Sequence, residues 1–189
     1  MTTRLPEFKQ GWTPEQTVAS SRFVLSIRGE PHVRDKTVDW LCRAWNKQAL
    51  VTTYLTGVAP FLENLTMLEN IWLPLTWRRQ TTLKQVMRKA ESKLSLFGWS
   101  QAELARLMQC RPGDLPHSVV GKAQLLRASL SDPDWVLIDA SWFLTPHLPL
   151  EKSIDILNNL LAKSRWLLFW PPETMPLPGG VVWDKIELI

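Results

Sequence analysis

The chain has 189 residues, with 22 basic and 18 acidic side chains that give a net charge of +4. At about 150 residues per domain, this length predicts a single domain. The hydrophobic fraction of 45% excludes an intrinsically disordered chain, because enough apolar surface is present to offset the entropy lost on folding. Only 8 glycines accompany 14 prolines, which is few for a protein that cradles phosphate groups in glycine-rich loops.

Cysteine usage and hydropathy together predict a cytoplasmic protein. Cys42 and Cys110 are isolated and lie outside any Cys-x-x-Cys motif, which fits a reducing compartment and gives no zinc-binding pattern. The first residues contain no apolar run of the kind found in signal peptides. No segment approaches the ~18 apolar residues of a membrane-spanning helix. We therefore expect no direct membrane insertion.

In chain order, apolar runs and helical periodicity predict alternating strands and helices. The predicted elements are a strand at 23–27, a helix at 36–45, a strand at 49–55, helices at 66–72, 83–97, 100–108 and 119–130, a strand at 135–138, a helix at 150–163, a strand at 166–170 and one or two short strands in the tail. Ser100 and Glu103 have the spacing of a capping box.

The order of these elements predicts an α/β domain with an insertion. Strands alternate with helices at both ends of the chain, which is typical of a parallel sheet with crossover helices. Residues 62–112 contain no strand candidate. We therefore expect one domain, with a core formed by about 1–61 and 113–189 and a helical subdomain formed by about 62–112.

The stretch from 114 to 142, DLPHSVVGKAQLLRASLSDPDWVLIDASW, carries a family resemblance. It has a leucine before a helix that contains Arg127, a turn at Pro133-Asp134, four apolar residues, and then Asp139. In this order and without a gap, it resembles the region of ATP-binding cassette (ABC) ATPases that runs from the signature motif to the Walker B aspartate. The resemblance implies a P-loop NTPase-like parallel sheet with an inserted helical subdomain and a reduced antiparallel β part.

A second stretch, FLENLTMLENIWLPL at 61–75, resembles the segment that follows the Q-loop in ABC cassettes. Its pattern Leu-Thr-x-x-Glu-Asn-x-x-x-Pro-Leu is similar to the cassettes of bacterial lipid-asymmetry (Mla-type) and lipoprotein-release transporters. In that family two cassettes pair with each other. A permease inserts a coupling helix into the groove between the core and the helical subdomain.

The nucleotide-binding motifs of the family are altered. In the gap-free register the loop at 29–37 keeps only Gly29 and Thr37, and Asp35 stands at the lysine position; a shift by one residue restores Lys36 and Thr37. Pro31 removes an N–H donor, and acidic side chains would repel a triphosphate. The other family positions are also replaced: the Q-loop glutamine by Gly57, the signature residues by Pro116, His117 and Ser118, and the Walker B glutamate by Ala140.

These departures predict a pseudo-ATPase that is not an enzyme and binds no nucleotide, metal or other cofactor. Gly29, Lys36, Thr37 and Asp139 would be remnants of the nucleotide site. The resemblance then implies a structural or regulatory subunit of a bacterial inner-membrane ABC transporter for lipids. Its partners would be a membrane permease and either a catalytic ABC ATPase or a second copy of the chain, with no nucleic acid. It would be cytoplasmic and peripheral on the inner membrane.

Two surfaces follow from the resemblance as expectations. The permease-docking groove would be lined by Gly57, Phe61, Leu62, Leu68, Trp72 and Trp77. The face toward a second cassette would contain His32, Arg34, Pro116, His117 and Ser118.

Two alternative functions remain open from the residues. The first is a residual ATPase with an unusual site built from Lys36, Thr37 and Asp139. The second is a stand-alone interaction module that could contact nucleic acid through the basic helix carrying Lys84, Arg88, Lys89 and Lys93. Asp139 could also be an ordinary cap at the end of a strand.

Overall fold

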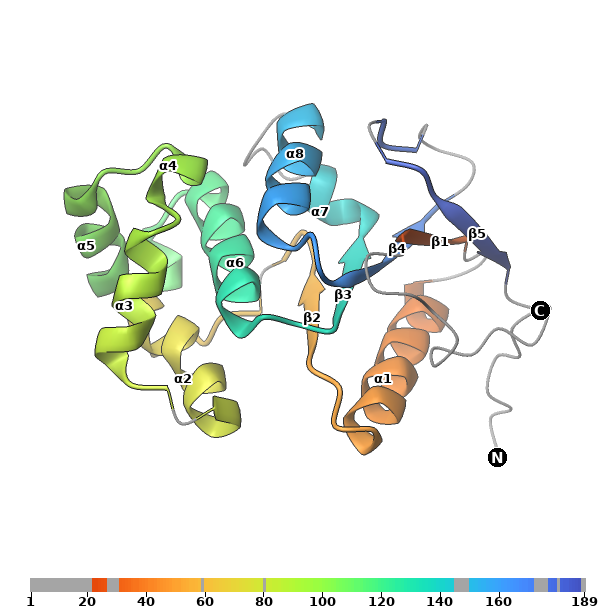
Figure 1. Ribbon diagram of the computed structural model, residues 1–189, viewed down its shortest axis with the longest axis horizontal. Helices are drawn as coiled ribbons and strands as arrows, with labels where there is room; N and C mark the ends of the chain where they lie inside the picture. Colours follow the sequence, from red (N-terminus) through yellow and green to blue (C-terminus); the bar gives the residue numbers. More distant parts are fainter. Residues whose placement is uncertain are drawn as a thin grey trace.

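The computed structural model describes residues 22–26, 31–58, 60–79, 81–144, 150–171, 177–179 and 181–187. Its centre is a five-stranded sheet in the order β2-β3-β4-β1-β5 (Figure 1). The strands are β1 (Arg22–Ser26), β2 (Thr52–Leu55), β3 (Trp135–Asp139), β4 (Arg165–Trp170) and β5 (Asp184–Glu187). Within the described residues all pairings of these strands are parallel, which confirms the predicted α/β class.

The helices connect the strands or form a separate group beside them. They are α1 (Pro31–Lys47), α2 (Met67–Arg79), α3 (Leu83–Glu91), α4 (Leu94–Phe97), α5 (Gln101–Gln109), α6 (His117–Ser131), α7 (Ala140–Leu144) and α8 (Leu150–Leu160). Helices α2 to α5 lie together at the left of Figure 1, where α2 packs on α5 and α6 and α3 packs on α6. No helix of the described residues is long and apolar enough to cross a bilayer.

Alternation along the strands divides the core into two layers. On one face, Leu25, Leu137 and Leu167 pack with Leu41 and Trp45 of α1. On the opposite face, the intervening strand residues pack with apolar side chains of α6, α7 and α8. Every residue of β3 is buried, as expected for a central parallel strand covered on both sides.

Two helix boundaries differ from the sequence prediction, and proline is involved in both. Helix α1 begins at Pro31 rather than at Lys36, because proline suits the first helical position and no glycine follows it before Thr37. Helix α2 continues through Pro74 to Arg79 rather than ending before it. The burial of Ile71 and Leu75 on one face of α2 offsets the backbone hydrogen bond that Pro74 cannot donate.

The predicted helix at 83–97 is divided into α3 and α4. Ser92 caps the end of α3 and Gly98 caps the end of α4; the φ of 66° at Gly98 is a left-handed conformation that glycine adopts without strain. The predicted capping box of α5 is confirmed, since Ser100 N donates to Glu103 Oε2 at 2.7 Å and Glu103 N donates to Ser100 Oγ at 3.2 Å. Helix α3 has the same box with a neutral partner, Gln85.

The stacked pair Trp45–Trp135 joins α1 to the centre of the sheet, with ring centroids 4.5 Å apart and planes 11° apart. Both side chains are fully buried. We expect Trp45→Ala to lower the free energy of unfolding by about 3–5 kcal/mol, through the lost transfer energy and the cavity left behind. Urea denaturation measures this change. Trp77→Ala, at an exposed tryptophan, is the control and should shift stability by less than about 0.5 kcal/mol; equal shifts would contradict the packing role.

The capping box of α5 should make part of the stability depend on acid. Hydrogen bonds from the backbone and side chain of Ser100 lower the pKa of Glu103 below its ordinary value of 4.5. A lowered carboxyl pKa stabilises the fold above about pH 4.5, and this contribution is lost as the pH falls through the lowered pKa. We expect Glu103→Gln, which copies the neutral box of α3, to unfold with a smaller loss of stability between about pH 7 and about pH 3. Urea unfolding at both pH values tests this. An equal loss of stability in the variant and in the unmodified chain would contradict it.

Candidate functional site

Asp139, the last residue of β3, is the centre of the candidate site. It is only 2% exposed, although it lies at the carboxyl edge of the sheet, where open α/β folds bind ligands. Its Oδ2 forms an ion pair with Arg34 Nη1 at 2.9 Å and accepts a hydrogen bond from Tyr54 Oη at 3.4 Å. Its Oδ1 accepts from Ser141 N at 2.8 Å. One carboxylate therefore joins α1, β2 and the start of α7.

The charges in this cluster influence one another. Burial alone would lower the pKa of Arg34, but the charge of Asp139 and a hydrogen bond to Asp35 together raise it. Burial, with the charge of Asp139 as the second cause, raises the pKa of Tyr54 to about 12. At neutral pH the Tyr54 phenol is therefore neutral, and its O–H donates to Asp139 Oδ2.

Gly57, which the resemblance aligned with the Q-loop glutamine, lies against the segment that follows Asp139. Its N–H donates to Ser141 Oγ at 3.0 Å. A Cβ at this residue would lie 2.9 Å from the backbone oxygen of Ser141, closer than real Cβ atoms come to any atom. Glycine is thus required at this position by the close approach of Ser141.

A cavity of about 240 Å³ adjoins Gly57. It is lined by residues from the segment after β2, the 3-10 turn at Pro112–Asp114, α6 and α7, among them Val58, His117 and Gln124. Gln124 is 1% exposed, and its Nε2 donates to Tyr54 O at 3.3 Å, while its Oε1 has no hydrogen-bond partner. The Gln124 side chain thus contributes a buried amide oxygen without a hydrogen-bond partner to the wall of this cavity.

The Leu-Thr-x-x-Glu-Asn pattern has a structural role that sequence reasoning missed. Thr66 and Glu69 form a capping box at the start of α2, with Thr66 N donating to Glu69 Oε2 at 2.7 Å. Asn70 is buried and holds the preceding loop: its Oδ1 accepts from Leu62 N at 2.7 Å, and its Nδ2 donates to Leu62 O at 3.0 Å and to Leu65 O at 3.2 Å. The spacing of Thr66 and Glu69 could have identified this box.

Arg127, which the resemblance aligned with the family's helix arginine, anchors the same loop from α6. Its Nη1 donates to Pro60 O at 3.1 Å, and its guanidinium lies 4.4 Å from the ring centroid of Phe61. Burial lowers the pKa of Arg127 to about 10. The loop at 60–66 is therefore fixed at both ends, by Arg127 and by Asn70.

The residues predicted to line a permease groove differ in exposure. Leu62 and Trp77 are exposed, Gly57, Leu68 and Trp72 are half-buried, and Phe61 is buried in the core. Trp72 Nε1 donates to Thr81 O at 3.0 Å, which fixes the connection between α2 and α3. Within the loop at 60–66, Leu62 is 54% exposed, although Asn70 holds its backbone.

The structure brings together only some of the residues predicted as remnants of the nucleotide site and as the face toward a second cassette. Lys36 is exposed and Thr37 is buried in α1, whereas Asp139 pairs with Arg34. Gly29 and the side chain of His32 lie outside the described residues. Pro116 and His117 are exposed and Ser118 is half-buried at the start of α6. Sequence reasoning placed Arg34 at a dimer face and missed its ion pair with Asp139.

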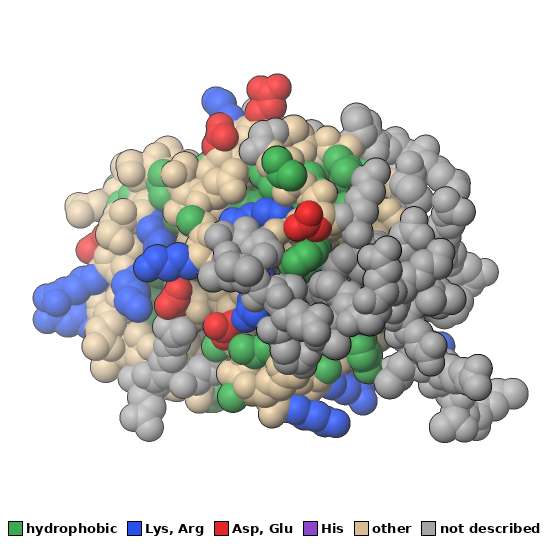
Figure 2. All heavy atoms as spheres, turned by 45° about the vertical axis from the view of Figure 1, so that its right-hand side comes forward, with side chains coloured by type: hydrophobic (Ala, Val, Ile, Leu, Met, Phe, Trp, Pro, Cys, Tyr) green, Lys and Arg blue, Asp and Glu red, His purple; other side chains and the backbone are tan. Residues whose placement is uncertain are grey.

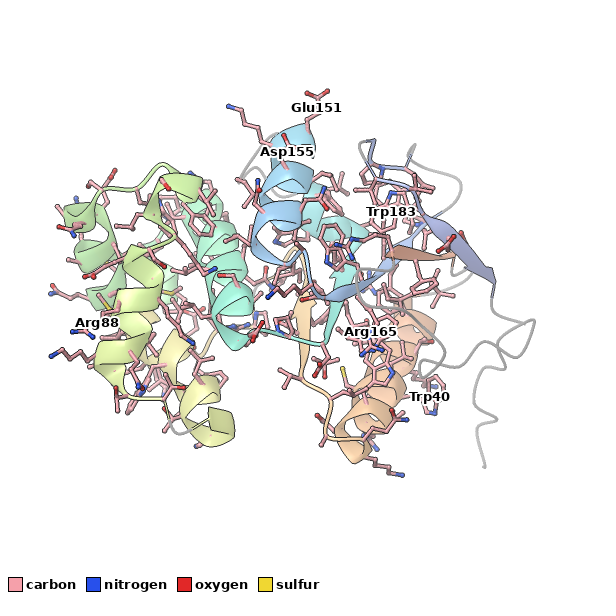
Figure 3. All side chains as sticks on the ribbon, in the orientation of Figure 1. Trp40, Arg88, Glu151, Asp155, Arg165 and Trp183 are labelled. Atoms are coloured by element: carbon pink, nitrogen blue, oxygen red, sulfur yellow. The ribbon has the colours of Figure 1, made fainter. Side chains whose placement is uncertain are left out.

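Two other surface features lie away from this cluster. Lys84, Arg88 and Lys89 are exposed on α3, and basic side chains gather at that end of the molecule (Figures 2 and 3).

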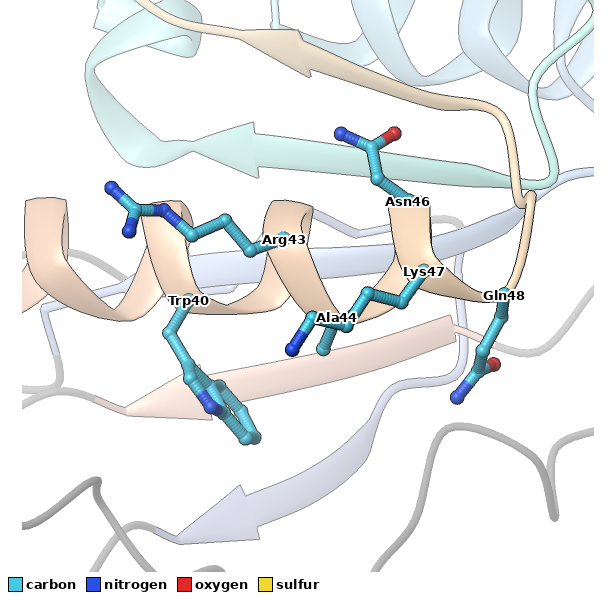
Figure 4. A pocket seen from close by; sticks show the side chains of 6 residues that line it. All are labelled: Trp40, Arg43, Ala44, Asn46, Lys47 and Gln48. Carbon is cyan, nitrogen blue, oxygen red and sulfur yellow. The ribbon is translucent and has the colours of Figure 1, made fainter.

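An open hollow of about 840 Å³ lies beside α1, lined by Trp40, Arg43, Ala44, Asn46, Lys47 and Gln48 (Figure 4). These lining residues come from one helix and its following turn, so no second element supplies a converging group among them.

No protein-family model and no curated protein matches the chain. Solved structures do share its fold. The dimeric ATP-binding cassette MJ0796 in a post-hydrolysis state bound to ADP and Pi superimposes with a TM-score of 0.61 at 14% identity, covering 81% of this chain and 76% of that one. An ATP-binding subunit of an ABC transporter gives 0.60 at 16%, covering 80% and 69%. A second dimeric structure of MJ0796 gives 0.60 at 13%, covering 89% and 83%.

The chain thus has the fold of ABC ATPases, which confirms the fold that the resemblance implied. The prediction that the chain is not an enzyme is wrong. The structures that share its fold are ATP-binding cassettes, one of them with the products ADP and Pi. Replacement of individual motif residues does not change this fold, because the fold depends on the packing of the sheet and the helices.

A magnesium ion bound with a nucleotide does not fit the described residues as they are arranged. Both oxygens of Asp139 are engaged, one by Arg34 and Tyr54 and the other by Ser141 N. The next residue, Ala140, brings no carboxylate. No three His, Cys, Asp or Glu side chains of the described residues are grouped so that they could hold a metal ion.

The close approach at Gly57 predicts a specific intolerance. Gly57→Ala would force a methyl group against the backbone of Ser141, so we expect a loss of about 1–3 kcal/mol in the free energy of unfolding. Gly113→Ala is the matched control, because its Cβ would meet only the far end of the exposed Glu63 side chain at 3.0 Å and should cost less than about 0.5 kcal/mol. Urea denaturation compares the two, and equal losses would contradict the close-approach argument.

Proposed function

We propose that this chain is a cassette-type subunit of a bacterial inner-membrane ABC transporter for lipids. It lies in the cytoplasm on the membrane surface, docked to a permease and paired with a second cassette, which is either a copy of itself or another ABC ATPase. Residues 62–112 form the helical subdomain in this proposal, and 1–61 and 113–189 form the core. The dimeric state of MJ0796 supports the pairing.

The observation that carries the proposal is the fixed apolar loop between β2 and α2. Val58 is 84% exposed and Leu62 is 54% exposed, although Leu62 N and Leu62 O are both held by the buried Asn70. An exposed apolar side chain on a rigid backbone loses little entropy on binding, which favours a protein contact. The cavity beside Val58 can take up a side chain of the partner.

The proposal that the transported substrate is a lipid rests on the stretch at 61–75. Its resemblance to lipid-asymmetry and lipoprotein-release cassettes covers the residues that form the capping box and the Asn70 anchor. A loop built in the same way would present its exposed residues to a permease of the same kind. The basic face of α3 offers no aromatic side chain interleaved with its charges, so a nucleic-acid role has less support.

Photo-crosslinking from position 62 tests the docking. A photoreactive amino acid replaces Leu62 in one variant and Leu83 in the control; Leu83 is 43% exposed on α3, away from the loop. In intact cells we expect a polytopic membrane protein to be crosslinked from position 62 and not from position 83. Mass spectrometry identifies the partner, and an ABC ATPase or a second copy should co-purify with it.

Leu62→Asp completes the test. The side chain is exposed, so the free energy of unfolding should change by less than about 0.5 kcal/mol. Recovery of the chain with membranes should fall at least tenfold, because a carboxylate would be desolvated at the interface. Unchanged membrane recovery of Leu62→Asp, or equal crosslinking from both positions, would overturn the proposal.

A further inference from the structure

Asp139 lies where P-loop NTPases place the aspartate that helps to hold Mg²⁺. In this chain the carboxylate is buried and already neutralised by a guanidinium at 2.9 Å. A buried carboxylate needs a cation beside it, and either a metal ion or an arginine can provide that charge. The two cannot both occupy the same side of one carboxylate oxygen.

We propose that Arg34 is a built-in cation that takes the place of a divalent metal ion at Asp139. A divalent cation can then reach Asp139 only by displacing Arg34. This inference rests on the fold and on the Arg34–Asp139 pair, not on docking to a permease.

The position of Arg34 is fixed by the fold rather than by its own flexibility. Because α1 begins at Pro31, Arg34 lies in a helix and not in a loop that could swing away. The same helix is tied to β3 by the Trp45–Trp135 stack, and β3 ends at Asp139. The guanidinium is held on its other side by Asp35 Oδ1, which accepts from Arg34 Nε at 3.2 Å. Packing therefore sets the distance between the two charges.

Among these contacts of Asp139, Arg34 brings the positive charge and the others are hydrogen bonds from neutral donors. Tyr54 Oη and Ser141 N donate to the carboxylate, so they complete its hydrogen bonds without neutralising its charge. Lys36, the other basic side chain of this turn, is exposed. Removal of the Arg34 charge should therefore leave a buried, unpaired carboxylate with a vacant position that suits a small cation.

Manganese binding tests the inference, with Mn²⁺ as the probe and electron paramagnetic resonance to count the free ion. The proteins are the full chain and its Arg34→Met variant, which keeps an apolar stem and removes the charge. We expect Arg34→Met to bind Mn²⁺ at least tenfold more tightly than the unmodified chain. Its Tm should be lower without metal and should recover in Mn²⁺, but not in NaCl of equal ionic strength.

Arg43→Met is the matched control. Arg43 lies on the same helix and pairs with Asp39 at 2.7 Å, but both side chains are exposed. Its Mn²⁺ affinity and Tm should equal those of the unmodified chain. The double variant Arg34→Met with Asp139→Asn should lose the gained affinity, because the carboxylate that attracts the ion is gone.

Each outcome decides the question. If the unmodified chain binds Mn²⁺ as tightly as Arg34→Met, or if the double variant keeps the gain, the inference is overturned. Should Arg34→Met fail to fold even with Mn²⁺, Arg34→Gln replaces it: it also removes the charge but keeps a polar end, and no gain in Mn²⁺ affinity for that variant counts against the inference. Crosslinking from position 62 is unaffected by these results, so the proposed transporter role stands or falls separately.

Discussion

The carboxylate of Asp139 imposes the constraint on which the arrangement of the site depends. A charge buried at the end of a central strand must be compensated, and here the compensation comes from three other parts of the chain: α1 supplies Arg34, β2 supplies Tyr54, and the start of α7 supplies the N–H of Ser141. Because each partner belongs to a different element, the contacts of Asp139 connect α1, β2 and α7 at one point. The close approach of Gly57 to Ser141 belongs to the same junction.

The surface that we propose for docking lies in the loop that follows β2. Arg127 and Asn70 hold this loop by the backbone of Pro60 and Leu62, so that the exposed side chain of Leu62 projects from a fixed backbone. The Leu-Thr-x-x-Glu-Asn pattern thus caps α2 and holds the backbone of the preceding loop. The ABC fold supplies the frame, and the replaced motif residues change what the carboxyl edge of the sheet presents.

Sequence patterns predicted the type of most elements and missed some of their ends. The alternation of strands and helices, the capping box at Ser100 and the position of Asp139 at the end of a buried strand were all readable, because they depend on local spacing and burial. The start of α1 at Pro31 and the passage of α2 through Pro74 were not, since packing of Ile71 and Leu75 outweighs a local helix-breaking signal. The expectation that the chain is not an enzyme rested on the altered residues of the nucleotide-binding motifs. The fold, which is shared with ATP-binding cassettes, corrected it.

By itself the sequence determined the parallel α/β class and the likeness to the ABC ATPase fold, and it predicted the run of helices between β2 and β3. These follow from hydrophobic period and from motif order, which are written along the chain. Only the tertiary structure decided that Arg34 pairs with Asp139, that Gly57 meets Ser141, and that Phe61 is buried while its neighbour Leu62 is exposed. Contacts between residues far apart in sequence depend on how α1 and α6 pack against the sheet, and no local pattern carries that information.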